Sequence, residues 1–461
     1  MKTNSDEMHN QEMLLKKIRQ SSEVFDKLAN SYEVWVPESG WLAGRRNRDK
    51  NDSKRKNLTD WSILSFLLEI DNCHYPMADS YLQYGIDGVI RIAAETLETL
   101  KNNLQSELQD QTQLDIAYLE SLLHVWKRFQ QFVADHMVLA LECAKQETSD
   151  TKKKRYEKIA KICQNLTINK PNTFCEALQL FWFTYLFRSP FGAGCIGRLD
   201  QLLYPFYKHD CEMGIWDQQE AEKMLEEMFT RMNEINTGDT LRNLMLSGQD
   251  AKGNDQTNEI TYLILVAYEN TGGSEPHLNV RFHEKTPKKL RDNCINMLSS
   301  GSGQPTIYFD EAVLPAMEKA GICHEDACQY ANDGCTETVI AGKSAIVFWQ
   351  YEMVKTVELT LFGGNENPCV KPVSMKKNSI HGVDFVPKTN LLIGIESKKT
   401  QELTTFSEFL SAFFEQMDHQ LDHYFLMIKQ KMQEDQTVSI TSPFTAGTFE
   451  KCLRTGKDPL R

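Results

Sequence analysis

The sequence predicts an α/β protein whose second half alternates short apolar strands with longer helices. Residues 277–282, His-Leu-Asn-Val-Arg-Phe, alternate in polarity as a strand does, and residues 305–309, Pro-Thr-Ile-Tyr-Phe, form a second apolar run after a glycine-rich turn. Strands that alternate with helices favour a parallel sheet, so we expect ligands to gather at the carboxyl ends of the strands. Helical patterns surround these strands, at 217–235, 255–269, 286–299 and 403–434.

The first 60 residues are predominantly polar and charged. We expect residues 1–60 to form a polar N-terminal arm and residues 61–461 to form one continuous domain, because the sequence contains no internal repeat and no low-complexity linker. Within the arm, the charge-dense stretch from Arg45 to Lys56 indicates a solvated surface loop rather than a basic binding patch.

Residues from about 84 to 165 have a mostly helical pattern. The basic tetrad from Lys152 to Arg155 indicates a helix start or an exposed turn. Apolar residues recur at steps of three to four and mark the faces of two long helices, the first through Leu97, Leu100, Leu104 and Leu108 and the second through Leu119, Leu122, Val125 and Phe129.

Composition limits the classes of function. The chain has 461 residues, 41% of them hydrophobic, and a formal net charge of −13, so it can bury a sizeable core and is a poor candidate for non-specific nucleic-acid binding. No apolar run of about 18 residues predicts a membrane span, and the N-terminus has no apolar signal segment. The 12 cysteines are scattered along the chain, so we expect a cytoplasmic protein with free thiols.

Three loops combine glycines or thiols with polar groups. In the first, residues 189–201, the glycine spacing differs from that of a phosphate-binding loop, and Arg198 and Asp200 are expected to form a structural ion pair. The second, residues 272–277, places His277 at the start of a strand, where a hydrogen-bonded core or rim histidine is the common finding. In the third, Cys323, His324 and Cys328 lack the paired spacing of a zinc site, so no metal site is predicted.

A fourth loop, Asn332 to Glu337, places Cys335 directly after Gly334 and two residues before Glu337. A carboxylate at this spacing could act as a base near whatever the sulfur attacks. From the residues alone, a buried and unreactive cysteine is the more common alternative.

The stretch from Tyr330 to Ser344, with Gly-Cys-x-Glu at its centre, resembles the cysteine loop of glycyl radical enzymes. The matching segments cover residues from about 70 to 461, and their number and order make the resemblance specific. Four further segments resemble that family in the family's own order: His74 with Asp79 to Tyr81 and Gly85 to Ile90, Gly197 to Tyr207, Gly272 to Leu278, and Gly303 to Glu311.

The resemblance implies a fold and a radical chemistry. The fold is a ten-stranded α/β barrel of two half-barrels wrapped by helices, present here in partial form. An activating enzyme with an iron–sulfur cluster and S-adenosylmethionine installs a radical on a backbone glycine in this family, so the chain itself is expected to bind no cofactor directly. Cys335 is then the residue that becomes a thiyl radical and takes a hydrogen atom from the substrate.

The resemblance also implies the class of reaction. In the eliminating members the glutamate of Gly-Cys-x-Glu removes a proton from a substrate hydroxyl, which gives this role to Glu337. We therefore expect a dehydratase or other lyase of anaerobic metabolism that cleaves a C–X bond in a small hydroxylated substrate. His74, Ser189 and His277 lie in segments that resemble pocket-lining parts of the family and are expected to bind the substrate, with either histidine as the acid for a leaving hydroxyl.

Two features of the family are changed in this sequence. Gly334 occupies the position of a second cysteine in pyruvate formate-lyase, so an acyltransferase of the formate acetyltransferase type is disfavoured, while a decarboxylase stays open. The glycyl radical loop, Arg-Val-x-Gly-aromatic, is not found. We therefore expect an activating enzyme as a partner, and a chain that is either a fragment of a longer protein or one subunit of a split enzyme with the radical glycine on a separate chain. A catalytically silent binding protein is the alternative, and a homodimer stays open.

Overall fold

The chain divides into two units, and each is described by itself. The larger unit contains residues 14–346 and 440–461, and the smaller contains residues 1–13 and 347–439. In the computed structural model the described residues are 4–45, 79–103, 110–188, 194–234, 242–334, 337–344, 353–365, 394–396, 402–438 and 440–459.

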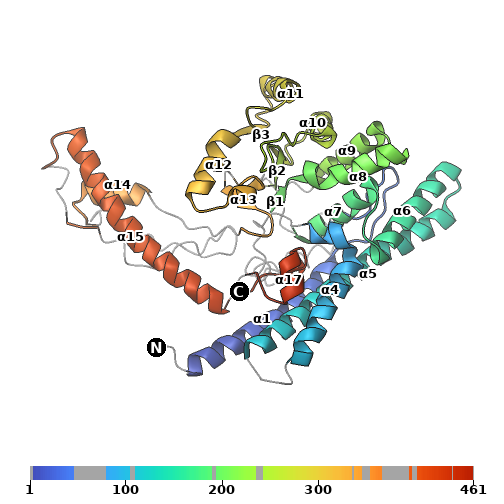
Figure 1. Cartoon of the computed structure of the whole chain (residues 1–461), viewed down its shortest axis with the longest axis horizontal. Helices are drawn as coiled ribbons and strands as arrows, with labels where there is room; N and C mark the ends of the chain where they lie inside the picture. The colour runs from blue at the N-terminus through green and yellow to red at the C-terminus, as the bar shows by residue number, and fades with distance from the viewer. Residues whose placement is uncertain are drawn as a thin grey trace, which may run out of the picture. The chain divides into compact units, whose positions relative to one another are not determined.

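A four-stranded parallel sheet lies in the larger unit (Figure 1). It confirms the expected parallel α/β arrangement. The last strand begins one residue later than predicted, because Pro305 has no N–H to donate to the ladder. Its strands are paired in chain order: β1 (Gly194–Gly197), β2 (Arg242–Ser247), β3 (His277–Phe282) and β4 (Thr306–Phe309).

The two faces of the sheet differ in chemistry, because successive side chains of a strand point to opposite faces. The apolar face belongs to the main hydrophobic core of the unit. The opposite face contributes Cys195 and Met245 to a second, smaller core. The residues of β2 and β3 in the main core are Leu244, Leu246, Leu278 and Val280.

An antiparallel hairpin covers this second face. It consists of β5 (Tyr330–Asp333) and β6 (Glu337–Ile340), with Asp333 paired to Glu337. Strand β5 contacts both β1 and β2. Among the described residues, the strands of the larger unit are the four parallel strands and this hairpin, so the ten-stranded barrel stays a prediction.

Helices flank the sheet at the predicted places. The predicted helix at 255–269 begins instead at Glu259, because Asn258 caps it: the Asn258 side chain accepts a hydrogen bond from the Thr261 N–H at 3.2 Å. The flanking helices are α7 (Phe174–Arg188), α8 (Leu199–Met213), α9 (Gln218–Glu234), α10 (Glu259–Thr271), α11 (Lys288–Ser299), α12 (Asp310–Lys319) and α13 (His324–Ala327).

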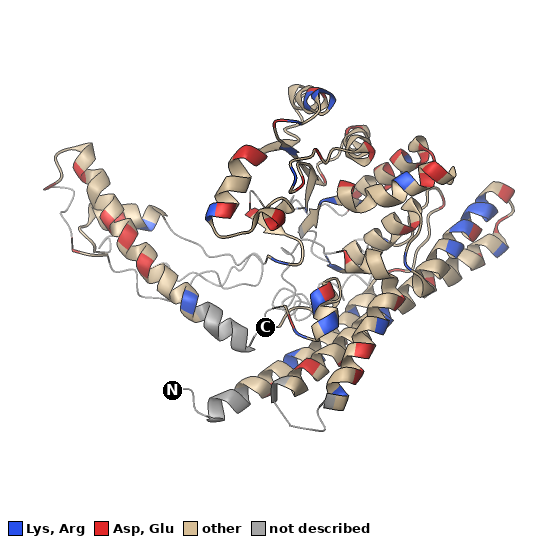
Figure 2. Ribbon diagram, in the orientation of Figure 1, with Lys and Arg blue, Asp and Glu red and all other residues tan. Residues whose placement is uncertain are grey.

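A second group of helices, most of them from the N-terminal part of the chain, packs together. The helix predicted through Leu119 and Phe129 is α5, and both residues are fully buried. Residues 104–109, which include two of the predicted leucines, lie outside the described residues. The basic tetrad from Lys152 is in the first turns of α6, as predicted (Figure 2). The members of the group are α1 (Asn4–Ser31), α4 (Ser80–Asn103), α5 (Asp110–Gln146), α6 (Asp150–Ile168), α16 (Pro443–Ala446) and α17 (Glu450–Thr455).

Part of the expected polar arm contributes to the main core. Leu14, Phe25 and Leu42 are among its buried residues, so the segment is amphipathic rather than uniformly polar. Its polar residues lie between apolar positions spaced as on one helix face. Residues 46–60 lie outside the described part of the chain, and the boundary at residue 60 stays a prediction.

The smaller unit contains α14 (Met353–Leu361) and α15 (Phe406–Val438), which corresponds to the helix predicted at 403–434. The hydroxyl of Thr356 donates to Oε1 of Gln420 at 3.1 Å and joins the two helices. In the described parts of both units, no helix is long and apolar enough to cross a membrane.

Candidate functional site

The turn of the β5–β6 hairpin contains the predicted reactive cysteine. Cys335 and Thr336 lie outside the described residues, whereas Gly334 and Glu337 on either side of them are described. Gly334 has a φ of +53°, and a Cβ added to it would lie 2.6 Å from Oε2 of Glu337. The Glu337 carboxylate therefore lies directly over the Gly334 backbone. The positive φ favours glycine at this position, and the carboxylate occupies the space that a Cβ would need.

The start of the hairpin is held at the carboxyl ends of the strands. The Cys328 carbonyl accepts hydrogen bonds from Nη1 of Arg281 at 2.9 Å and from Nη1 of Arg198 at 3.2 Å. Arg281 is near the end of β3, and Arg198 directly follows β1. These two guanidinium groups fix the position at which the chain enters the hairpin.

A buried ion pair supports this anchor. Nε and Nη2 of Arg281 donate to the two oxygens of Asp310 at 2.8 and 2.9 Å, and both side chains are fully buried. The Tyr330 hydroxyl donates to Asp310 at 3.0 Å, and the Arg281 guanidinium lies 4.0 Å from the centre of the Tyr330 ring. Burial raises the pKa of Tyr330, so its hydroxyl stays protonated and remains a donor.

The turn of the hairpin is held at the opposite end of the sheet. Nδ2 of Asn243, the second residue of β2, donates to the Gly334 carbonyl at 2.8 Å. The hairpin thus enters at the carboxyl ends of the strands, and β5 runs back along the sheet to their amino ends. Gly334 therefore lies at the amino ends of the strands, and the expectation that ligands gather at the carboxyl ends stays a prediction.

His277 opens β3 in register with Asn243, at the same end of the sheet as Gly334. Burial lowers its pKa, which makes the imidazole largely neutral near neutral pH. Its Nδ1 is buried without a hydrogen-bond partner among the described residues. His74 and Ser189 lie outside the described residues. Contact of these three residues with a substrate stays a prediction.

Arg198 and Asp200 have structural contacts, but the expected ion pair between them is not among the described ion pairs. Instead, both bind the backbone of Ser247. Nη2 of Arg198 donates to the Ser247 carbonyl at 2.8 Å, and the Ser247 N–H donates to Asp200 at 2.8 Å. Ser247 has a φ of +62°, a conformation that is uncommon for a residue with a side chain. The two charged groups therefore stabilise an unusual backbone conformation at the end of β2.

Of the two thiols and the imidazole in the loop of Cys323, His324 and Cys328, only His324 and Cys328 approach each other. Nε2 of His324 is 3.6 Å from the sulfur of Cys328, whereas Nδ1 of His324 is 2.6 Å from Glu318. No cluster of three or more His, Cys, Asp or Glu side chains suited to a metal ion occurs within the described residues.

Sequence reasoning missed the side chains that hold the hairpin. Asn279 and Arg281 occupy alternate positions of the predicted β3 strand, and this period of two was a usable signal that both face one side. Asn243 gave no such signal, because β2 was not predicted as a strand. Cys195 was also missed; burial raises the pKa of its thiol, and the nearby Asp333 raises it further.

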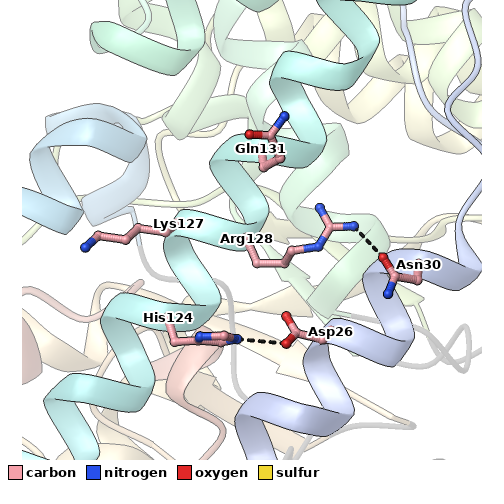
Figure 3. Close-up of a pocket in the computed structure, with 6 residues that line it drawn as sticks. All are labelled: Asp26, Asn30, His124, Lys127, Arg128 and Gln131. Carbon is pink, nitrogen blue, oxygen red and sulfur yellow. Dashed lines mark hydrogen bonds and ion pairs between the residues drawn. The ribbon is translucent and has the colours of Figure 1, made fainter.

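A shallow pocket of about 470 Å³ lies elsewhere in the larger unit, between α1 and α5 (Figure 3). His124 pairs with Asp26 at 2.9 Å, and Arg128 donates to Asn30 at 2.8 Å. The pocket shares no residue with the hairpin and is not part of the candidate site. Its lining residues are Asp26, Asn30, His124, Lys127, Arg128 and Gln131.

Comparison with known sequences identifies the relatives of the chain. The family model described as pyruvate formate lyase-like matches residues 72–460. The chain is 30% identical over 346 residues to trans-4-hydroxy-L-proline dehydratase from Clostridioides difficile, covering 70% of this chain and 40% of that protein. It is 26% identical over 393 residues to (2S)-3-sulfopropanediol dehydratase from Klebsiella oxytoca, covering 81% of this chain and 44% of that protein. The chain thus spans less than half the length of these relatives.

Solved structures agree with the sequence comparison. Hydroxyproline dehydratase from Clostridioides difficile matches with a TM-score of 0.71 and 26% identity, over 85% of this chain and 49% of that chain. The B12-independent glycerol dehydratase from Clostridium butyricum has the same fold, with a TM-score of 0.75 and 20% identity, over 97% of this chain and 62% of that chain. The chain belongs to the pyruvate formate lyase-like family of glycyl radical enzymes, in its dehydratase and lyase branch.

Proposed function

We propose that this chain provides the catalytic region of a glycyl radical lyase that breaks a C–X bond in a small hydroxylated substrate. Cys335 carries the thiyl radical, and Glu337 is the general base. The observation that supports this assignment is the position of the Glu337 carboxylate directly over Gly334, the residue that precedes Cys335. A base next to the reactive sulfur is what elimination beside a carbon radical requires.

In the proposed reaction, the sulfur of Cys335 takes a hydrogen atom from the carbon that bears the hydroxyl, so that an S–H bond forms as the C–H bond breaks. Glu337 accepts the hydroxyl proton. The negative charge beside the carbon radical then helps to expel a group from the neighbouring carbon, and this group leaves with the electron pair of its bond. The product radical takes the hydrogen atom back from the Cys335 thiol, which restores the thiyl radical.

The leaving group is proposed to be water or sulfite. The relatives are named as dehydratases of hydroxyproline and of sulfopropanediol, and a further relative, 32% identical over 237 residues, is isethionate sulfite-lyase from Nitratidesulfovibrio vulgaris. His74, Ser189 and His277 are proposed to line the substrate pocket. Burial lowers the pKa of His277, which favours the neutral imidazole, and a proton passed on from Glu337 would restore it as the acid for a leaving hydroxide.

The proposed enzyme needs other proteins. A glycyl radical, installed by an activating enzyme that uses S-adenosylmethionine and an iron–sulfur cluster, would supply the unpaired electron. The radical glycine is proposed to lie either in a further part of the same protein or on a separate chain, and the protein is proposed to be cytoplasmic. A catalytically silent binding protein is the competing proposal, and it predicts neither a neighbouring gene for the radical-glycine segment nor one for an activating enzyme.

Anaerobic reconstitution tests the proposal. The chain, the activating enzyme and the radical-glycine segment, as part of the same protein or as a separate chain, are mixed with a panel of small hydroxylated compounds that carry hydroxyl or sulfonate leaving groups. Cys335→Ala is expected to abolish turnover. Glu337→Gln is expected to retain the glycyl electron spin resonance signal and the exchange of substrate hydrogen with deuterated water, while elimination is lost.

Three outcomes contradict the proposal: full turnover by Cys335→Ala, unchanged elimination by Glu337→Gln, or no glycyl signal in any combination of partners. Release of CO₂ from a hydroxyaryl acetate would favour the decarboxylase alternative. A 27% identical relative, the 4-hydroxyphenylacetate decarboxylase glycyl radical subunit from Clostridioides difficile, supports including that substrate class in the panel.

A further inference from the structure

Three asparagines from three strands meet beside the turn of the hairpin. Nδ2 of Asn279 donates to Oδ1 of Asn243 at 3.0 Å, and Nδ2 of Asn332 approaches the same oxygen at 3.4 Å. Asn243 in turn donates to the Gly334 carbonyl at 2.8 Å. All three side chains are buried. We call Asn243, Asn279 and Asn332 the asparagine relay.

The relay is directional. Asn279 and Asn332 each direct an amide N–H toward Asn243, and their Nδ2 atoms also donate to the His277 carbonyl at 3.1 Å and to the Tyr308 hydroxyl at 3.0 Å. Oδ1 of Asn279 and Oδ1 of Asn332 are buried without a hydrogen-bond partner among the described residues. Buried acceptors without donors destabilise a fold, so an arrangement that leaves two of them unpaired needs an explanation. An amide whose oxygen accepts hydrogen bonds becomes a stronger donor at its nitrogen. The arrangement thus strengthens the bond from Asn243 to the Gly334 carbonyl.

The relay acts on a strand whose other end is also fixed. Arg281 and Arg198 hold the Cys328 carbonyl, and Asn243 holds the Gly334 carbonyl six residues further along the chain. A strand held at both ends cannot slide along the sheet beneath it. The carbonyl of Gly334 belongs to the peptide bond that leads into Cys335, so Asn243 fixes the last backbone group before the reactive residue.

We propose that the asparagine relay is a positioning device for the hairpin turn, in which Asn243 sets the placement of the Gly334 carbonyl, the last described backbone group before Cys335, relative to Glu337. Asn243 is a positioning residue, because it acts through the backbone of the loop. This inference deepens the proposed function and rests on Cys335 as the reactive residue. The effect of Asn243 on the order of the loop backbone can be measured in the chain without any radical.

The test measures the order of the loop in the intact chain. Asn243→Asp keeps the shape of the side chain but replaces the donor with an acceptor, and Asn279→Ala removes one donor to Asn243 while leaving the Gly334 bond in place. The matched control is Asn233→Ala. Asn233 makes a bond of the same kind, to the Glu275 carbonyl at 2.7 Å, in another loop of the same unit.

Two readouts are combined. The first is the rate at which a small haloacetamide alkylates Cys335, measured by peptide mass spectrometry and referenced to the exposed Cys211 and Cys323 in the same sample. The second is the deuterium uptake of peptides that contain Gly334. Asn243→Asp is expected to raise the Cys335 rate by about tenfold, the factor that corresponds to the loss of one buried hydrogen bond. Asn279→Ala is expected to give a smaller rise and Asn233→Ala none.

Unchanged alkylation and unchanged deuterium uptake in Asn243→Asp would overturn the inference, and so would an equal rise in Asn233→Ala. If Asn243→Asp fails to fold, Asn279→Ala decides: a rise confined to the hairpin supports the relay, and no rise refutes it. In the reconstituted enzyme, Asn243→Asp is expected to lower kcat with little change in KM. Absence of a glycyl signal in the unmodified enzyme would count against the proposed function but would leave the alkylation result standing.

Discussion

The substitution Gly334→Ala tests two features of the hairpin turn at once, the left-handed backbone of Gly334 and the position of the Glu337 carboxylate beside it. The backbone of Gly334 has a φ of +53°, and placing a side chain in this left-handed conformation costs about 1–2 kcal/mol. The new Cβ would also lie 2.6 Å from Oε2 of Glu337, about 0.8 Å short of ordinary van der Waals contact. The carboxylate is the far end of a flexible side chain, so it can move at little further cost in stability.

The functional effect should be larger than the effect on stability, because the carboxylate has to leave its place over the loop. A displacement of about 1 Å in a catalytic group can lower the rate by about 100-fold. We therefore expect Gly334→Ala to lose about 1–2 kcal/mol in urea unfolding and elimination activity by about 100-fold in the reconstituted enzyme. The glycyl radical signal should persist, because the substitution leaves the Cys335 thiol intact.

Gly272→Ala is the matched control. Gly272 has a φ of +59°, and a Cβ added there would meet nothing within 4 Å. Its backbone strain equals that of Gly334→Ala, but no carboxylate has to move, so stability should fall to a similar extent while elimination is retained. If Gly334→Ala keeps normal elimination, or if both variants lose it equally, the position of the Glu337 carboxylate does not have the importance assigned to it.

Three further predictions concern other parts of the larger unit. Burial lowers the pKa of His136 in α5 from 6.5 to about 4. The fold is therefore fully stable above about pH 6.5, where His136 is neutral, and loses about 2 kcal/mol of its free energy of unfolding at pH 5, because the unfolded chain binds the proton more readily. In urea unfolding, His136→Phe should lose less stability between pH 7.5 and 5 than the unmodified chain, and equal losses would refute this. Arg281→Met should destabilise the unit by about 3–5 kcal/mol, because it leaves the Asp310 carboxylate buried without its guanidinium partner. The double variant Arg281→Met with Asp310→Leu should recover part of this loss in urea unfolding, and no recovery would contradict the explanation. Arg454→Ala removes an exposed ion pair with Glu450 and should leave the urea midpoint unchanged, so a clear shift would show that this pair is worth more than exposed pairs usually are.

The elements predicted best are those whose pattern depends on one buried face. Strand β3 was predicted with its observed bounds, because His277 to Phe282 alternate between a polar and an apolar face. Strand β2 was missed because all of its residues are buried, so Leu244, Met245 and Leu246 form an apolar run without alternation. Strand β1 was missed because its four residues lie within a glycine-rich segment that is typical of a loop.

The sequence singles out residues of the hairpin turn but not the contacts that support the hairpin, and the site itself stays a prediction. Gly334 and Glu337 could be singled out from the sequence, because a glycine, a thiol and a carboxylate at this spacing resemble a known loop. Strand β5 was read as a loop, because Asn332 and Asp333 are polar residues of the kind that usually face solvent. They are buried here, and the Asn332 amide donates to the Tyr308 hydroxyl at 3.0 Å, a contact that sequence spacing alone does not reveal.

The two-ended anchorage of the hairpin has a consequence for how the protein folds. Its anchors join residues that are far apart in the chain: 130 residues separate Arg198 from Cys328, and 91 separate Asn243 from Gly334. Such contacts close long loops and form late, after local structure. Strand β5 has both of its anchors only when β1, β2 and β3 are in place, because the anchoring side chains belong to or directly follow these strands. We therefore expect Gly334 and Glu337 to be brought together late in folding, so that a nascent or partly folded chain lacks this arrangement.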